Sequence, residues 1–289
     1  MLRVLGRRSD GYHEIETIFH SVGLADDLWI RTTSSGRVEL DMALEAGVRG
    51  PAPAPRDNLA ARAAVELASS CGRRAGAEIR ITKRIPIGAG MGGGSANAAG
   101  VLVALNRLWG LGRTDRELAE LAARLGSDVP YCVTGGTARA TSRGEVLTPL
   151  LSPDRLWFVL GLSSEPLGTG AVYAATSRFD AVAGVGPMEA ALRAGDPARV
   201  GELLHNGLEP AIFALRPELE DAKGAVLRAG ALGACLSGSG PTVFGLARDE
   251  AHAGDLAARL EGVFSRVVVA SSRPGCVEPL DAPPEESSS

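Results

Sequence analysis

The stretch that decides the fold spans residues 80–100 and reads RITKRIPIGAGMGGGSANAAG. Its pattern predicts a strand, then a loop with glycine at five of the seven positions 88–94, then an apolar helix. Glycine lets the backbone approach a ligand closely, and the first N–H groups of a helix favour negative charge. We interpret the stretch as an anion site and not as a flexible surface turn, because the glycines lie between two well-patterned elements.

The elements around this loop have clear periodicity. Residues 78–85 alternate isoleucine with polar side chains, which predicts a half-buried, antiparallel, edge-type strand that ends at Pro86. Residues 95–108 are apolar almost all round and predict a core helix. Upstream, Asp57 is expected to cap a helix over residues 58–70. The buried stripe of that helix is predicted to consist of Leu59, Ala63, Val65 and Leu67.

The rest of the chain alternates between strand-like and helix-like segments. Thr114 and Glu117 form a capping box for a helix that runs to residue 125. Further strands are expected near residues 15–24, 28–31, 38–40, 156–160, 234–236, 243–246 and 266–270. Further helices are expected near residues 170–178, 187–194, 197–206, 217–229 and 250–261. The pattern resets around residues 149–153, so we expect domains at 1–152 and 153–273, followed by a disordered tail at 274–289.

The bulk composition is that of an ordinary globular chain of 289 residues. A net charge of −4 gives no general attraction to nucleic acid or to an acidic membrane, so neither is expected as a partner. The four cysteines form no CxxC pair, which favours free thiols in a reducing compartment. No segment has the pattern of a signal peptide or a membrane span, and we expect a cytoplasmic protein. The sequence leaves the choice between monomer and homodimer open.

Three glycine-loop chemistries compete for residues 86–96. A P-loop needs a lysine before the closing Ser or Thr, and Ser95 follows Gly94 directly. A dinucleotide fingerprint needs a ribose-binding acid about 20 residues later, where this chain has the end of a helix and a loop. The remaining interpretation is a wider arch that wraps a triphosphate and offers the Ser95 hydroxyl near its metal.

The arch resembles the ATP loop of the GHMP kinase superfamily, which includes galactokinase, homoserine kinase and mevalonate kinase. The resemblance runs from about residue 4 to about residue 272, and four further motifs support it: DGYHE at 10–14, GSDVP at 126–130, GGTA at 135–138 and LSGSGPT at 236–242. They are most similar to those members that phosphorylate the 2-hydroxyl of a diphosphocytidyl-methylerythritol in the non-mevalonate isoprenoid pathway. The resemblance implies an α+β fold with two lobes, an N-terminal ribosomal-protein-S5-like ATP lobe and a C-terminal ferredoxin-like lobe.

The same resemblance implies roles for individual residues. Asp128 matches the family's catalytic aspartate and would accept the hydroxyl proton; taken alone, it is equally an N-cap ahead of Val129-Pro130. Mg²⁺ would arrive with ATP, near Ser95, and not through a protein metal motif. The implied ATP-binding residues are Asn58, Lys83, Pro86, Ile87, Gly88, Ala89, Gly90, Met91, Gly92, Gly93, Gly94, Ser95 and Ala96.

A second group of residues is implied at the substrate. Tyr12 and His13 match the pair that recognises the cytosine base, and Tyr173 matches an aromatic side chain that stacks on it. Tyr173 is about as well explained as a half-buried core residue. Thr169 matches a substrate contact, and Ser237, Gly238 and Ser239 belong to the second glycine motif.

One family feature has no counterpart in this sequence. The family carries a lysine on its first strand, upstream of the DGYH motif, and the corresponding position would precede Met1. Neither Lys83 nor Lys223 matches that position, so we expect the chain to lack the start of its first strand. Two alternatives to the leading assignment stay open: another small-molecule kinase of the superfamily, such as homoserine kinase, or a nucleotide-binding homologue with impaired catalysis.

Overall fold

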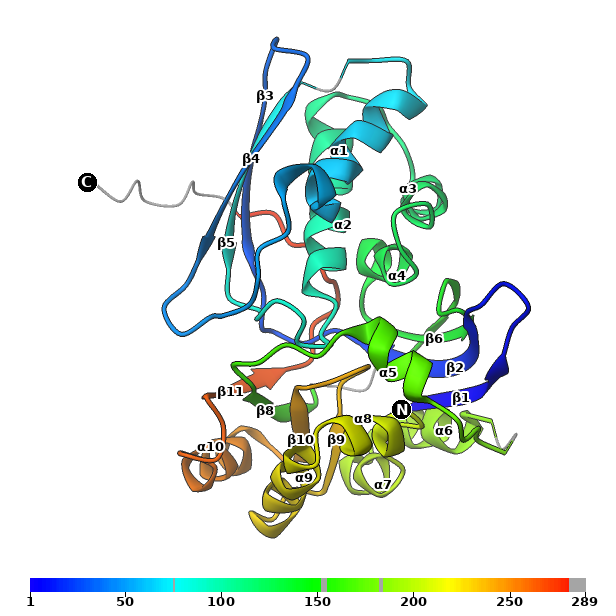
Figure 1. The fold of residues 1–289 in the computed structure, drawn as a ribbon, viewed down its shortest axis with the longest axis vertical. Helices are drawn as coiled ribbons and strands as arrows, with labels where there is room; N and C mark the ends of the chain where they lie inside the picture. The colour runs from blue at the N-terminus through cyan, green and yellow to red at the C-terminus, as the bar shows by residue number, and fades with distance from the viewer. Residues whose placement is uncertain (75, 152–154, 182–183, 281–289) are drawn as a thin grey trace.

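The computed structural model describes residues 1–74, 76–151, 155–181 and 184–280, and it has two lobes (Figure 1). The strands are β1 (Leu2–Arg7), β2 (His13–His20), β3 (Asp27–Thr32), β4 (Val38–Leu44), β5 (Ala77–Lys83), β6 (Thr137–Ser142), β7 (Val146–Leu150), β8 (Trp157–Leu162), β9 (Gly233–Leu236), β10 (Val243–Ala247) and β11 (Arg266–Ser271). The helices are a 3₁₀ turn η1 (Pro55–Asp57), α1 (Leu59–Ser70), α2 (Gly93–Leu108), α3 (Asp115–Ala122), α4 (Val129–Thr134), α5 (Thr169–Ala175), α6 (Gly186–Ala194), α7 (Pro197–Glu202), α8 (Glu209–Leu215), α9 (Glu218–Arg228) and α10 (Glu250–Arg259).

The upper lobe in Figure 1 contains two sheets with helices between them. One sheet has the order β3-β5-β4 and the other the order β1-β2-β6-β7. Helices α1 and α2 lie against each other, and α2 also contacts β3 and α4. The core of this lobe is built from the apolar stripes of these elements, with Leu67, Ile79, Leu102 and Leu105 fully buried. Burial of this stripe holds α2, and with it the glycine loop at its start, against the sheet.

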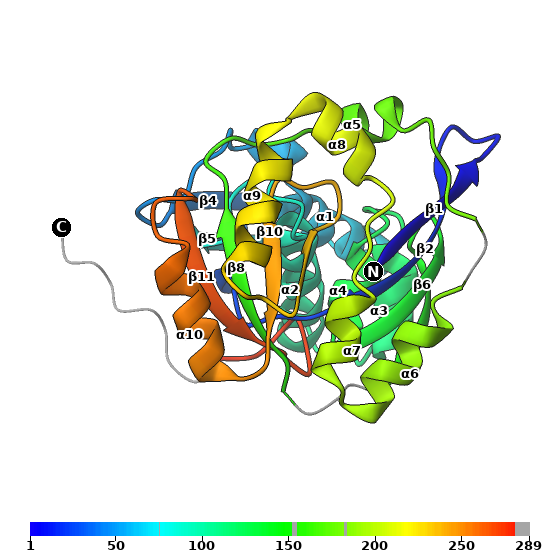
Figure 2. The ribbon, with the colours of Figure 1, turned by 90° about the horizontal axis from the view of Figure 1, so that it is seen from below.

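The lower lobe is built on an antiparallel sheet with the order β11-β8-β10-β9. This order is that of a ferredoxin-like βαββαβ unit, in which the first and third strands are central. Figure 2 shows α9 and α10 covering one face of the sheet. Strand β8 is buried on both faces, because Phe158 and Leu160 belong to one apolar cluster and Val159 to another. Its continuous apolar sequence follows from this double burial.

Strand β1 joins the two lobes. It pairs with β2 in the upper lobe, while the Leu2 N–H donates to the His205 carbonyl at 2.8 Å. The Asp180 N–H donates to the Val4 carbonyl at 2.7 Å. Leu2 and Val4 are buried in the same cluster as β8, β10 and α10 of the lower lobe. The predicted boundary at residues 152 and 153 falls on positions outside the described residues.

Most predicted elements are present, and the two-lobed α+β fold is confirmed. The Thr114–Glu117 capping box is formed with both reciprocal bonds. The N-cap of α1, however, is Asn58 and not Asp57, because the Asn58 side chain accepts from the Ala60 N–H at 2.9 Å. The predicted buried residue Val65 is 50 % exposed, since the stripe of α1 consists mainly of alanines and Leu67.

Two larger expectations differ from the structure. Strand β5 is the central strand of its sheet and not an edge strand: it pairs antiparallel with β3 and parallel with β4. Residues 274–280 were expected to belong to a disordered tail, but Cys276 and Val277 pack against the core of the upper lobe. A carbon on Gly135 would lie 2.4 Å from the Cys276 nitrogen, so the two segments are in close contact. The other tail residues, 281–289, lie outside the described residues.

Candidate active site

A cleft of about 1950 Å³ lies between the lobes, and its walls come from both of them. Every residue that the sequence predicts to bind or act on a ligand lines this cleft. From the upper lobe these are Tyr12, His13, Asn58, Lys83, the loop 86–96 and Asp128. From the lower lobe they are Thr169, Tyr173, Ser237, Gly238 and Ser239. The fold therefore brings together motifs that are spread over most of the chain.

The glycine loop runs from the end of β5 to the start of α2. Gly88, Gly90 and Gly92 have φ values of +74°, +72° and +66°, a conformation that other residues adopt only with strain. Helix α2 begins at Gly93, two residues before the predicted start, and no side chain caps it. Its first N–H groups are therefore available to an anion in the cleft.

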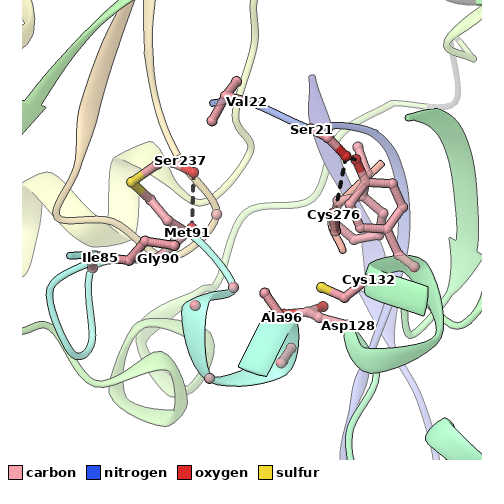
Figure 3. Close-up of a pocket in the computed structure, with 18 of the residues that line it drawn as sticks. Ser21, Val22, Ile85, Gly90, Met91, Ala96, Asp128, Cys132, Ser237 and Cys276 are labelled. Atoms are coloured by element: carbon pink, nitrogen blue, oxygen red, sulfur yellow. Dashed lines mark hydrogen bonds between the residues drawn. The ribbon is translucent and has the colours of Figure 1, made fainter. Parts of the chain in front are cut away.

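The two glycine motifs hold each other. The Ser237 hydroxyl donates to the Gly90 carbonyl at 2.9 Å (Figure 3). The Thr242 N–H donates to the Ala89 carbonyl at 3.4 Å. A Cβ atom on Gly90 would lie 2.3 Å from the Ser237 carbonyl oxygen. Glycine at position 90 is therefore required by the close approach of the two loops as well as by its φ value.

Lys83 lies beneath the glycine loop and is buried. Its ammonium group forms an ion pair with Asp26 and donates to the Asn97 Oδ1 atom at 3.1 Å. Asp26 also accepts from the backbone N–H groups of Arg84 at 2.7 Å and Ile85 at 2.9 Å. These bonds fix the point where the chain leaves β5 and enters the loop. Sequence reasoning assigned no role to Asp26 or Asn97: Asp26 belongs to no motif, and Asn97 lies in the glycine-loop motif just after the last residue predicted to bind ATP, Ala96.

Asn58 and Ser95 differ in whether their side chains already make a hydrogen bond within the protein. Asn58 is buried and uses its Oδ1 atom to cap α1. Ser95 is partly buried in the first turn of α2, and its hydroxyl has no hydrogen bond to the described part of the chain. Ser95 is thus free to bond to a ligand in the cleft.

Asp128 occupies the N-cap position of α4, but its side chain makes no capping bond. The alternative explanation, that Asp128 only caps α4, therefore accounts for the position of its backbone but leaves its carboxylate without a role. No described residue forms a hydrogen bond or ion pair with that carboxylate. It is open to the water of the cleft, where it faces the same space as the start of α2 (Figure 3), yet surrounding protein atoms bury it enough to raise its pKa.

An aromatic group forms the other end of the cleft. The rings of His13 and Tyr173 are 5.1 Å apart and tilted by 38°. Burial, and secondarily the charge of Asp128, raises the pKa of Tyr173 to about 12, so the phenol stays neutral. Burial also lowers the pKa of His13, with a smaller contribution from Arg7, which favours the neutral imidazole. Tyr12 is 54 % exposed.

The lower lobe also contributes hydroxyl groups to the lining of the cleft. Thr169 begins α5, and its hydroxyl is 2.9 Å from that of Ser239. The second glycine motif is held from behind by Asn206, a buried residue whose Nδ2 atom donates to the carbonyls of Leu236 at 3.0 Å and Gly238 at 2.7 Å. Sequence reasoning missed Asn206, which lies 30 or more residues before the carbonyls that it holds.

Two thiols lie in the wall near Asp128. Cys132 is four residues after Asp128, and its pKa is raised chiefly by its interaction with the Cys276 thiol and by burial. The Ser21 hydroxyl is 3.0 Å from the Cys276 sulfur and 2.8 Å from the Tyr131 hydroxyl (Figure 3). The interaction with Cys132 is the main cause that lowers the pKa of the Cys276 thiol to about 7. In the described part of the chain the four cysteines are free, as predicted.

The chain is similar to known proteins over most of its length. The family model "GHMP kinases N terminal domain" matches residues 58–136, which contain the glycine loop and Asp128, and "GHMP kinases C terminal" matches residues 188–266. A curated protein of Symbiobacterium thermophilum is 46 % identical over 90 % of this chain and 91 % of its own length. The chain belongs to the GHMP kinase family.

Two curated relatives of this GHMP kinase have the same name. The Symbiobacterium protein and a 43 % identical protein of Mycobacterium tuberculosis, which matches 90 % of this chain and 83 % of its own length, are both named 4-diphosphocytidyl-2-C-methyl-D-erythritol kinase. A crystal structure of 4-(cytidine 5'-diphospho)-2C-methyl-D-erythritol kinase superposes with a TM-score of 0.78 at 36 % identity over 94 % of both chains. A homoserine kinase of Cytophaga hutchinsonii reaches 0.74 at 24 % identity, over 89 % of this chain and 88 % of its own, which shows the shared fold alone.

None of the described helices of the GHMP kinase combines the length and apolar character needed to cross a membrane. Among the described residues, no three His, Cys, Asp or Glu side chains gather where they could hold a metal ion.

Proposed function

We propose that this GHMP kinase transfers the γ-phosphoryl group of ATP to the 2-hydroxyl of 4-diphosphocytidyl-2-C-methyl-D-erythritol, in the non-mevalonate isoprenoid pathway. The observation that carries the proposal is the unpartnered carboxylate of Asp128 in a cleft that also contains the glycine loop and the His13–Tyr173 ring pair. The names of relatives at 42–46 % identity support the choice of substrate. We place the reaction in the cytoplasm, where ATP is made available.

Asp128 is the general base in this proposal. The proton of the substrate hydroxyl passes to the carboxylate as the oxygen attacks the γ-phosphorus. The bond between the γ-phosphorus and the bridging oxygen breaks, and that oxygen leaves as part of ADP. A carboxylate with a raised pKa is a stronger base than an ordinary one, which suits this task. Because the carboxylate is not committed to capping α4, it needs to break no bond before it accepts the proton.

ATP is assigned to the glycine loop. The free N–H groups at the start of α2 would bind its phosphates, since the helix terminus carries partial positive charge. Asn58 lines the nucleotide end of the cleft, and Lys83 acts through Asp26 by fixing the entry to the loop. We assign no direct phosphate contact to Lys83, because its ammonium is already paired.

The residues present fit a magnesium ion that arrives with ATP. Mg²⁺ commonly takes one or two protein oxygens and leaves the other positions to phosphates and water. The hydroxyl of Ser95 and the carboxylate of Asp128 have no described partner and line the same cleft. When bound, the ion would neutralise charge on the phosphates and offset the repulsion between them and Asp128.

The diphosphocytidyl group is assigned to the aromatic end. Tyr12 and Tyr173 offer ring faces for stacking on the base, and His13 offers ring nitrogens for its edge. Thr169 and Ser237–Ser239 offer hydroxyl and backbone groups to the rest of the substrate. Tyr173 also packs against the apolar core of the lower lobe, so both interpretations of this residue apply.

The test is a coupled assay of ADP release with the diphosphocytidyl substrate. Asp128→Asn keeps the size of the side chain and removes the base, so we expect kcat to fall by roughly 10²–10⁴-fold with little change in the KM for ATP. Asp115→Asn, in the exposed first turn of α3, is the matched control and should leave kcat unchanged. Turnover of homoserine in place of the diphosphocytidyl substrate would contradict the proposal. ATP binding without any turnover would contradict it in favour of a non-catalytic nucleotide-binding protein.

A further inference from the structure

Two turns form the rim of the cleft at its aromatic end. One turn joins β1 to β2 and carries Asp10 and Tyr12; the other joins β6 to β7 and carries Arg143. The guanidinium carbon of Arg143 lies 4.8 Å from the centre of the Tyr12 ring, which is the geometry of a cation–π contact. Both side chains line the cleft. The proposed function uses Tyr12 but assigns nothing to Arg143.

Arg143 is held in place by Glu145. The Glu145 carboxylate accepts from the backbone N–H of Arg143 at 2.8 Å and from its Nε atom at 3.3 Å. It also accepts from the Ser142 hydroxyl at 3.2 Å. Ser142 is the one non-glycine residue with positive φ in the described chain, at +64°. A non-glycine residue keeps such a strained conformation only where surrounding contacts hold it. Here it belongs to the turn that carries Arg143 at the rim of the cleft.

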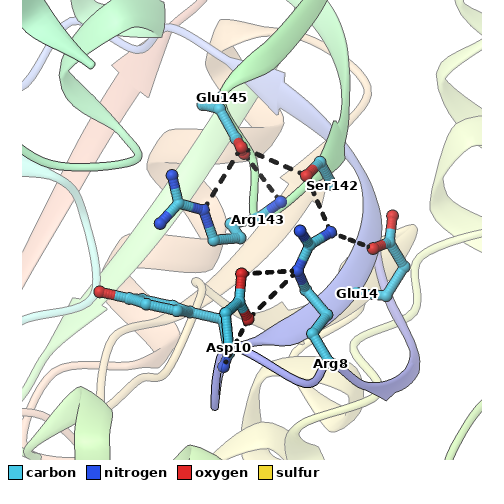
Figure 4. A network of polar contacts seen from close by, with 7 residues as sticks. Arg8, Asp10, Glu14, Ser142, Arg143 and Glu145 are labelled. Carbon is cyan, nitrogen blue, oxygen red and sulfur yellow. Dashed lines mark hydrogen bonds and ion pairs between the residues drawn. The ribbon is translucent and has the colours of Figure 1, made fainter. Parts of the chain in front are cut away.

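Hydrogen bonds continue from Ser142 to the other turn (Figure 4). Arg8 donates from Nη1 to the Ser142 hydroxyl at 3.1 Å and from Nε to the Asp10 carboxylate at 3.1 Å. Asp10 in turn accepts from the backbone N–H of Tyr12 at 3.1 Å. The contacts therefore close a circuit that runs from Tyr12 through Asp10, Arg8, Ser142 and Glu145 to Arg143 and back to the Tyr12 ring.

We propose that Arg143 is a positioning residue for base binding: its guanidinium covers one face of the Tyr12 ring and so fixes the ring with its other face open to the base. This inference rests on the proposed function, because it concerns how Tyr12 meets a diphosphocytidyl group. An aromatic ring has two faces, and Tyr12 keeps about half of its surface exposed with Arg143 in place. A ring already ordered by the circuit loses less freedom when the base stacks on it.

The experiment measures kcat and KM for the diphosphocytidyl substrate and for ATP in a set of variants. Arg143→Met removes the cation and keeps an extended side chain, and we expect the substrate KM to rise roughly two- to fivefold. We expect kcat and the KM for ATP to stay unchanged, because neither depends on the Tyr12 ring. Arg143→Lys keeps a cation over the ring and should recover part of the loss.

A double-mutant cycle separates positioning from other causes. If Arg143 acts through Tyr12, the variant Tyr12→Ala/Arg143→Met should bind substrate no more weakly than Tyr12→Ala alone. Arg73→Met is the matched control: Arg73 lies 5.2 Å from the Trp109 ring, and neither side chain lines the cleft. It should change neither KM. The thermal midpoint of each variant reports any loss of folding.

The dissociation constant of cytidine 5′-diphosphate, measured by calorimetry on the same variants, gives a readout that does not need turnover. Additive effects of the two substitutions would overturn the inference. So would an Arg143→Met variant with unchanged or tighter binding while Tyr12→Ala weakens it, and in that case the proposed function stands. If Tyr12→Ala leaves both constants unchanged, the base-binding role of Tyr12 fails and the inference fails with it.

Discussion

Lys83 illustrates how much a single side chain depends on its partners. Its place before the glycine loop predicts proximity to a nucleotide, and it does line the cleft. Its ammonium, however, is bonded to Asp26, which is 57 residues away in the sequence. No local pattern distinguishes Asp26 from the neighbouring acidic residue Asp27, so the pair could not be predicted. By contrast, Asp128 and His13 could be placed from their motifs, because each motif is a continuous run of residues.

The buried pair gives a prediction for stability. Asp26→Asn leaves the Lys83 ammonium buried without its counter-charge, and breaking such a pair costs about 3–5 kcal/mol. We expect the free energy of unfolding in urea to fall by about that amount. Glu66→Gln, which breaks the exposed pair with Arg124, is the control and should cost about 0–1 kcal/mol. Similar losses of unfolding free energy in the two variants would show that the buried pair stabilises the fold no more than an exposed pair does.

At the scale of elements, the order strand, glycine loop and helix could be predicted from residues 80–100 alone. The central position of β5 could not be predicted, because its parallel pairing with β4 depends on the crossover connection through α1. The local sequence pattern does not show that connection. Short elements such as β7 and α8 were also missed. They follow turns, and their residues carry too few periods to be distinguished from loop.

The glycine loop permits a matched comparison of two glycines with nearly equal φ. Gly92→Ala places a Cβ atom where nothing lies within 4 Å, so its cost should be the backbone strain of about 1–2 kcal/mol. Gly90→Ala places it 2.3 Å from one carbonyl oxygen and 2.5 Å from another. The two glycine motifs must then separate.

We expect Gly90→Ala to lower the free energy of unfolding by more than Gly92→Ala does. We also expect it to raise the KM for ATP by about tenfold or more, which corresponds to about 1.4 kcal/mol. Denaturant titration and steady-state kinetics on the two variants check this. Equal effects at both positions would mean that the contact between the motifs is not needed.

For the whole molecule, the sequence predicts two lobes of mixed structure, and that is what the fold contains. The joining of the lobes through β1 could not be predicted, because its partners at residues 180 and 205–207 are remote and lie in loops. His20 marks the same junction. Its ring bonds to Thr137 of β6 and to Ser272 after β11, at 2.8 Å each, and lies 5.6 Å from the Phe158 ring of β8.

His20 predicts how stability depends on pH. Burial lowers its pKa from 6.5 to about 4, so between these values the unfolded chain binds a proton that the folded chain does not. Above about pH 6.5 the neutral His20 ring therefore carries no penalty for stability. As the pH falls toward 4, the free energy of unfolding decreases by about 3 kcal/mol in all on account of this residue. We expect the free energy of unfolding to fall less over this interval in His20→Gln. Parallel pH curves for the two proteins would contradict this.

The double attachment of β1 has a consequence for synthesis on the ribosome. The N–H of Val4 bonds to the Asp180 carboxylate at 2.9 Å, a partner that lies 176 residues later. At about 5–20 residues per second, that partner is translated roughly 10–35 seconds after β1. During this delay Leu2 and Val4 have only β2 beside them, and their lower-lobe neighbours do not yet exist. The nascent chain therefore carries an exposed apolar strand edge for most of its translation, and chaperones that hold such edges would act on this protein before its second half is made.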